Sequence, residues 1–172
     1  MRKVTFRVAN SLDNYIARED GSVDWILHSD DANSSLADFW KTIDTVLWGR
    51  KTYDIVKGRM PAYTDVKNYV FSRTLKESAD KGVEIVNGDA VDFVRNLKNQ
   101  EGKAIFVMGG GELAKSLFEG DLIDEVGVNI HPILLGSGIP LFHEMKGQIN
   151  LKLLECTSLK NGCVLLSYRV KR

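Results

Sequence analysis

One short stretch constrains the fold of this chain more than any other: an apolar run followed by three consecutive glycines. Ile105 to Met108 is typical of a strand that is buried on both faces of a sheet. Gly109–Gly111 end that strand, and the apolar residues Leu113, Leu117 and Phe118 then recur with helical spacing. The sequence therefore predicts a buried strand, a glycine turn and a helix in direct succession.

This junction is also a candidate anion site. Glycine lets a phosphate approach the bare backbone, and the N–H groups of the first helical turn favour its negative charge. The alternative is a tight turn between strand and helix that binds nothing. Three glycines after a buried strand favour phosphate binding.

The rest of the chain repeats the alternation of strands and helices. Strands are predicted at 4–9, 45–48, 68–71, 83–86 and 122–130, with the first in the centre of the sheet. Asp30 or Asp31 is predicted to cap a helix that runs through Leu36, Phe39, Trp40 and Ile43, and Asp89 to cap another, with a short helix predicted at 50–56. The segments 132–142 and 58–65 are predicted loops, and the runs 151–159 and 163–170 flank Asn161-Gly162, typical of a two-residue hairpin.

This order predicts a single three-layer α/β domain over residues 1–172. Its sheet is mainly parallel, with helices on both faces and a C-terminal antiparallel hairpin.

Composition excludes several classes of function. Lys plus Arg and Asp plus Glu number 23 each, so no global field recruits nucleic acid or an anionic membrane. No apolar run approaches the ~20 residues of a membrane span, and the N-terminus lacks the apolar core of a signal peptide. Cys156 is expected to lie near Ser167 and not opposite Cys163, so both cysteines are expected to be reduced. These features predict a cytoplasmic protein.

Three predicted strand ends carry chemistry that suits phosphate, and ligands of parallel sheets bind at such ends. Gly49 to Thr52 combines a helix N-terminus with two cations and a hydroxyl. Ser72-Arg73-Thr74 places a guanidinium between two hydroxyls, which suits a phosphomonoester. With Gly109–Gly111, these sites match a dinucleotide that carries an extra 2′-phosphate. The G-x-G-x-x-G fingerprint is absent, so the predicted site is not of the Rossmann type.

The same segments resemble a known fold. Val46 to Tyr53, Ser72 to Thr74 and Val107 to Glu112 resemble the cofactor-binding segments of the dihydrofolate reductase fold. Ala9 to Asp13 and Leu122 to Phe142 resemble the C-terminal reductase domain of the bifunctional riboflavin-biosynthesis deaminase-reductase. The resemblance covers nearly the whole chain and implies an eight-stranded sheet. The zinc signature of the deaminase half is absent, so the resemblance implies a stand-alone reductase-like domain.

The resemblance implies an NADPH-dependent oxidoreductase that forms a homodimer. Its substrate would be a small pyrimidine- or pterin-like heterocycle, as for 5-amino-6-(5-phosphoribosylamino)uracil reductase. A dihydrofolate reductase-type activity and a non-catalytic nucleotide-binding module are the alternatives. His28, His131 and His143 have no spacing typical of a metal site, so no metal is expected.

The resemblance also assigns site residues. The catalytic candidates are Asp13, Asp30 and Asp31, and the candidates for contacting the substrate are Trp25 and Tyr53. Two positions depart from the families: the acid expected in the first long helix falls on Asn33, and Asn14-Tyr15 replaces a Gly-Lys pair. The predicted cofactor-binding set is Ala9, Ile16, Gly49, Arg50, Lys51, Thr52, Ser72, Arg73, Gly109, Gly110, Gly111 and Glu112.

Overall fold

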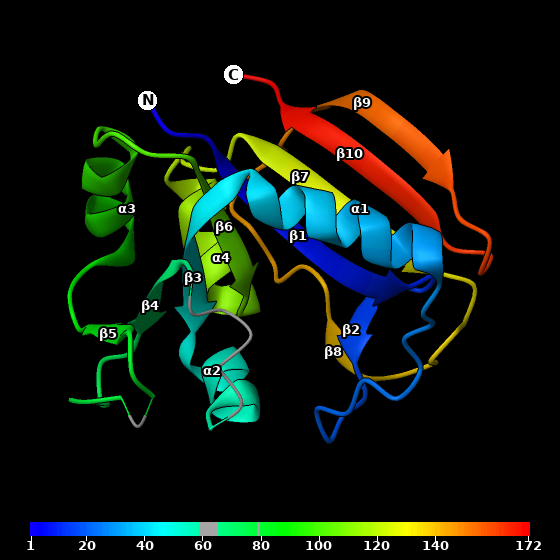
Figure 1. The fold of residues 1–172 in the computed structure, drawn as a ribbon, viewed down its shortest axis with the longest axis horizontal. Coiled ribbons are helices and arrows are strands. Elements are labelled where there is room, and N and C mark those ends of the chain that lie inside the picture. Colours follow the sequence, from blue (N-terminus) through cyan, green and yellow to red (C-terminus); the bar gives the residue numbers. More distant parts are fainter. Residues whose placement is uncertain (59–64, 79) are drawn as a thin grey trace.

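The computed structural model describes residues 1–58, 65–78 and 80–172 (Figure 1). In these ranges the backbone forms an eight-stranded sheet with the order β5-β4-β3-β6-β1-β7-β10-β9. Most of the predicted loop at 58–65 lies outside the described residues. The strands are β1 (Val4–Ser11), β3 (Ile43–Gly49), β4 (Lys67–Phe71), β5 (Val83–Val86), β6 (Ala104–Gly109), β7 (Glu125–His131), β9 (Leu151–Ser158) and β10 (Val164–Val170).

The sheet confirms the predicted fold class. Along the sheet order, the strands β5, β4, β3, β6, β1 and β7 pair in parallel, whereas β10 pairs antiparallel with both β7 and β9. β1 pairs in parallel with both β6 and β7, which confirms its predicted central position. A strand in such a position has no exposed edge, so it provides a fixed frame for residues at its carboxyl end.

Helices cover both faces of the sheet, as predicted. They are α1 (Asp30–Lys41), α2 (Arg50–Val56), α3 (Ala90–Lys98) and α4 (Gly111–Glu119). Phe39 of α1 and Tyr53 of α2 share one core cluster with Val46 and Trp48 of β3. Leu47, between them on β3, faces the opposite cluster, which α3 and α4 cover. Figure 1 shows α1 crossing the sheet in front of β1 and β7.

Two short strands were not predicted, and one of them lies within the predicted loop at 132–142. β2 (Tyr15–Ala17) pairs with β8 (Ile139–Pro140) in a separate two-stranded sheet. Gly138 permits this approach, because a Cβ built there would overlap the carbonyl oxygen of Ala17. Period-2 patterning cannot reveal such short strands, because their pairing depends on segments far apart in the chain.

The C-terminal hairpin is present, but its predicted turn is wrong by one residue. The N–H of Leu159 donates to the carbonyl of Cys163 at 2.8 Å, so the loop has three residues, with Gly162 at φ +86°. Cys156 therefore lies opposite Leu166. Both cysteines are free, Cys156 exposed and Cys163 buried.

A buried ion pair joins the amino end of the sheet to α3. The Lys98 ammonium donates to the Leu122 carbonyl at 2.9 Å and to Asp124 at 2.5 Å. The backbone N–H of Val4 donates to the same carboxylate at 2.7 Å. Burial alone would raise the pKa of Asp124, but these donors outweigh it and lower that pKa. In the described ranges, no helix is long and apolar enough to cross a membrane.

Lys98→Met should lower the free energy of unfolding by roughly 2–4 kcal/mol at neutral pH, because it leaves Asp124 short of its buried partner. The folded-state pKa of Asp124 is depressed, so this stabilisation exists above the ordinary carboxyl pKa and is lost as pH falls. Urea unfolding at several pH values measures both effects. Lys146→Met is the control, since that side chain is 89% exposed. Equal losses for both variants would contradict the prediction.

Candidate active site

Two glycines bring the carboxyl ends of β3 and β6 into backbone contact. A Cβ built on Gly49 would lie 2.9 Å from the Cα of Gly110, and one built on Gly110 would lie 2.9 Å from the Cα of Gly49. Gly110 and Gly109 also have φ values of +93° and +143°, where side chains are disfavoured. As a result, α2 and α4 begin side by side at this edge of the sheet.

The first turns of these two helices receive no side-chain cap. Their N-cap residues, Gly49 and Gly110, provide no acceptor, whereas Asp89 caps α3 as predicted. The cap of α1 is Ser29 and not the predicted Asp30 or Asp31, which are the first two residues of the helix itself. Free N–H groups at adjacent helix starts are a suitable environment for phosphate oxygens. The residues present at this junction therefore fit the two phosphates of a dinucleotide.

Gly111 has a separate role that the sequence did not reveal. A Cβ built there would overlap the imidazole of His143, which packs against the start of α4. The Nδ1 atom of His143 lies 3.5 Å from Oε1 of Glu112, whose side chain is 76% exposed. The third glycine thus makes room for His143, one of the three histidines whose spacing is not typical of a metal site.

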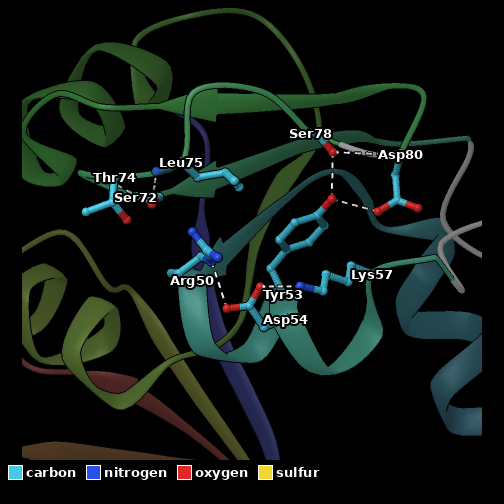
Figure 2. A network of polar contacts seen from close by, with 9 residues as sticks. All are labelled: Arg50, Tyr53, Asp54, Lys57, Ser72, Thr74, Leu75, Ser78 and Asp80. Carbon is cyan, nitrogen blue, oxygen red and sulfur yellow. Dashed lines mark hydrogen bonds and ion pairs between the residues drawn. The ribbon is translucent and has the colours of Figure 1, made fainter.

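The cations next to this junction are placed by α2. Figure 2 shows the Arg50 guanidinium between α2 and the turn at Ser72–Leu75. Its Nε donates to Asp54 at 2.7 Å, and this bond lowers the pKa of that carboxylate. Thr52 lies against Gly109, since a Cβ there would be 3.4 Å from the Thr52 hydroxyl. Lys51 is exposed.

The second predicted phosphate contact is a turn built by Ser72. Its buried hydroxyl accepts the N–H groups of Leu75 at 2.9 Å and Thr74 at 3.3 Å (Figure 2). Asn87 donates to the carbonyl of Ser72 at 2.6 Å and fixes the turn from the next strand end. Arg73 is exposed beside it. These bonds thus fix the backbone on both sides of exposed Arg73.

Tyr53 lies in the core and not at a surface. Its side chain is 1% exposed, and its hydroxyl lies 2.6 Å from both Ser78 and Asp80 (Figure 2). A buried ring with a partnered hydroxyl indicates a structural role, which is to link α2 to Ser78 and Asp80. The predicted contact of Tyr53 with the substrate receives no support from this position.

Asp13 joins the end of β1 to the loop after β7. Its carboxylate accepts the Ser11 hydroxyl at 2.6 Å, the N–H of Gly136 at 2.8 Å and the N–H of Leu135 at 3.1 Å. These bonds, that of Ser11 above all, lower the pKa of Asp13. Asp13 is therefore ionised at neutral pH, which disfavours it as a proton donor.

Asp31 is held in the same way at the start of α1. It accepts the Ser29 hydroxyl at 2.6 Å and the N–H of Lys160 at 2.9 Å, and the Ser29 bond is the main cause of its lowered pKa. Asp31 thereby joins α1 to the C-terminal hairpin. Asp30 is exposed in the same turn. Of the three predicted acids, two are held as carboxylates by local donors.

Arg7 is a half-buried cation on the central strand. Its guanidinium carbon lies 4.4 Å from the centroid of the Phe39 ring on α1, and it donates to Ser167 at 3.2 Å. Gly127 makes room for it, because a Cβ there would lie 2.7 Å from its Cγ. Burial lowers the pKa of Arg7, and it forms no ion pair with any described residue. The sequence signal was an arginine within an apolar strand.

Two aromatic rings meet where the carboxyl ends of β1 and β7 lie under α1. Trp25 is 5% exposed, and its ring lies edge-on to that of His131 at 5.3 Å between centroids. The Nδ1 atom of His131 accepts the N–H of Leu27 at 3.2 Å, and Cys163 Sγ lies 3.2 Å from the same nitrogen. Trp25 was predicted to contact the substrate, but His131 was missed because its partners are remote in sequence.

Two further residues of the predicted cofactor-binding set, Ala9 and Ile16, lie on β1 and β2. Ala9 is half-buried on β1, opposite Asn129 of β7. Ile16 lies in β2 and packs against the core cluster that α3 and α4 cover. In the described part of the chain, no group of three or more His, Cys, Asp or Glu residues could hold a metal ion.

Comparison with known proteins places this geometry in a family. A family model for the RibD C-terminal domain matches residues 2–165. The uncharacterized protein YwjB of Bacillus subtilis (strain 168) is 40% identical over 155 residues, which cover 88% of this chain and 89% of that protein.

Solved structures share the fold. A putative riboflavin biosynthesis protein from Shewanella sp. PV-4 has a TM-score of 0.85 at 28% identity, with all of both chains covered. The deaminase/5-amino-6-(5-phosphoribosylamino)uracil reductase of Thermotoga maritima has a TM-score of 0.75 at 18% identity, covering 99% of this chain and 57% of that one. Enterococcus faecalis dihydrofolate reductase, complexed with NADP(H) and RAB-propyl, has a TM-score of 0.75 at 17% identity, covering 99% and 97%.

Gly49→Ala should destabilise the protein by about 1–3 kcal/mol, because its Cβ would overlap the backbone of Gly110. Gly147→Ala is a matched control, since a Cβ at that exposed glycine meets no atom within 4 Å. Thermal unfolding of the two variants measures the difference. Equal melting temperatures would show that the contact between β3 and β6 is not a constraint.

Proposed function

The chain belongs to the RibD C-terminal domain family, and we propose that it is an NADPH-dependent reductase of a pyrimidine- or pterin-like heterocycle. The observation that carries the proposal is the pair of helices that begin side by side on uncapped Gly49 and Gly110. The Enterococcus faecalis enzyme, complexed with NADP(H), and the Thermotoga maritima enzyme, named as a uracil reductase, support it at the level of the fold.

The phosphate-binding roles follow from the positions of the cations. The pyrophosphate would lie at the start of α4, against the N–H groups that follow Gly110. The 2′-phosphate would lie between Arg50 and Arg73, close to the Ser72 hydroxyl. Arg50 would then exchange its bond to Asp54 for a charge-assisted bond to phosphate, which is of similar strength. Lys51 and Thr52 belong to the same turn.

When bound, the nicotinamide supplies a hydride to the substrate. The chain's own residues would hold the two reactants in place. Ala9 is a small, half-buried side chain on the central strand, and Asp13 fixes the loop that follows β7 by two backbone hydrogen bonds. Arg7, which has no carboxylate partner among the described residues, would neutralise an anionic group of the substrate.

A non-catalytic nucleotide-binding module is the second candidate function. The observation that favours it is the state of the predicted acids, since local donors lower the pKa of both Asp13 and Asp31. An acid that is ionised at neutral pH is poorly suited to protonate a substrate. A proton from water would keep the reductase proposal intact.

Arg50→Ala and Arg73→Ala should each raise the dissociation constant of NADPH about tenfold or more and leave that of NADH nearly unchanged. The reason is that each removes a charge-assisted hydrogen bond, worth about 1.5–3 kcal/mol, to the 2′-phosphate only. Fluorescence titration with both cofactors measures the difference. Arg95→Ala is the control, since that side chain pairs with Asp92 on remote α3. Equal weakening for NADPH and NADH would refute the 2′-phosphate assignment.

Turnover separates the two candidate functions. Oxidation of NADPH, followed by its absorbance, should accelerate with at least one member of a panel of dihydropterins and aminopyrimidinones. The double variant Arg50→Ala, Arg73→Ala is the control and should need more NADPH for the same rate. Tight binding of NADPH without turnover of any panel member would favour the binding module.

A further inference from the structure

Four side-chain polar atoms are buried without a hydrogen-bond partner among the described residues. One is Oδ1 of Asn10, which alternates with Ala9 and Ser11 on β1 and so faces the other side of the sheet. The other three lie on the side that α1 covers. They are Nε1 of Trp25, Nε2 of His131 and Oδ1 of Asn129. The side chain of Trp25 is 5% exposed and that of His131 is fully buried. An unsatisfied buried group is costly, and native structures keep such groups where a ligand or another function requires them.

The three atoms belong to one face of the sheet. Asn129 and His131 are two residues apart on β7, so their side chains point to the same side. Their partners across the ladder are Ala9 and Ser11 of β1. Arg7 precedes them on this face and contacts Phe39 of α1, so the face is the one that α1 covers. The ring of Trp25 lies edge-on to that of His131.

The hydrogen bonds assign the proton of His131. Because the N–H of Leu27 donates to Nδ1, that nitrogen is an acceptor and the neutral ring carries its proton on Nε2. Burial lowers the pKa of His131, and nearby His28 adds to this effect. The face therefore presents two N–H donors, from Trp25 and His131, and one amide oxygen acceptor, from Asn129.

We propose that Trp25, His131 and Asn129 recognise the lactam edge of the substrate heterocycle, a ring carbonyl next to a ring N–H. This inference rests on the proposed reductase function and names the chemistry of its substrate. The carbonyl oxygen has two lone pairs and accepts both N–H donors, and the ring N–H donates to Asn129. Uracil-type and 4-oxopterin-type rings carry this edge, whereas the corresponding amino-substituted rings do not.

A pair of matched probes tests the donor pattern. 6-Aminouracil carries the lactam edge, and in 2,4,6-triaminopyrimidine amino groups replace both carbonyl oxygens of the same ring. Each is added to ¹⁵N-labelled protein with and without saturating NADP⁺, and the indole N–H resonances are followed. Trp25→Phe assigns the Trp25 resonance. The indole of Trp48 is an internal reference, because its N–H already donates to Asn68 at 3.0 Å.

6-Aminouracil should shift the Trp25 resonance and leave that of Trp48 in place, and triaminopyrimidine should shift neither. His131→Gln should raise the dissociation constant of 6-aminouracil about tenfold, the loss expected for one hydrogen bond of about 1.4 kcal/mol. His28→Gln, a change to an exposed histidine in the same region, should leave it unchanged. Trp25→Phe keeps an apolar ring and should match the tenfold loss when binding is followed by calorimetry.

The outcomes separate this inference from the function on which it rests. No shift of Trp25 at millimolar 6-aminouracil, or equal shifts with both probes, overturns the inference even if NADP⁺ binds. A selective shift in a protein that fails to bind NADP⁺ supports the lactam site and refutes the reductase proposal. Unchanged affinity in both His131→Gln and Trp25→Phe overturns the assignment of the donors.

Discussion

The contact between the backbones of Gly49 and Gly110 is the constraint on which the rest of the site depends. Neighbouring parallel strands are about 4.8 Å apart. Here β3 continues directly into α2 and β6 into α4, and the two strand ends stay in contact where the helices begin. Any Cβ at either position would force β3 and β6 to separate. Because α2 and α4 follow directly, the contact also fixes where their first turns lie. The position of Arg50 at the start of α2 is a consequence of the same approach.

The candidate anion site depends on the absence of side-chain caps at the starts of α2 and α4. The side chains of Ser29 and Asp89 accept a backbone N–H in the first turns of α1 and α3. Those two helix starts therefore leave fewer N–H groups unpaired for a ligand. α2 and α4 begin on glycine, so their first N–H groups have no side-chain acceptor. The chain thus distinguishes structural helix starts from candidate binding ones by a single residue type. Arg50 is the first residue of α2, so its cation lies at one of the two uncapped helix starts.

The fold was predictable because local patterns and tertiary packing agree. Burial on both faces made β3 and β6 continuous apolar runs, and Asp89 caps α3 as its position suggested. The site was less predictable, because its determining contacts join distant segments. Gly111 suggested phosphate binding, but its neighbour is His143; His131 looked isolated, but Leu27, Trp25 and Cys163 surround it. The hairpin turn differed by one residue because Asn-Gly also suits a three-residue loop.

The carboxylates and the buried histidine of the candidate site differ in protonation state, and this difference suits them to different roles. Asp13 and Asp31 accept hydrogen bonds from hydroxyl and backbone donors, which keeps them ionised and assigns them to holding loops together. His131 has the opposite environment: burial keeps it neutral, and its Nδ1 bond to Leu27 directs the proton to Nε2. A neutral imidazole can donate a hydrogen bond to a carbonyl without adding a buried charge. In the proposed reductase, the carboxylates fix the shape of the pocket and the neutral donors recognise the substrate.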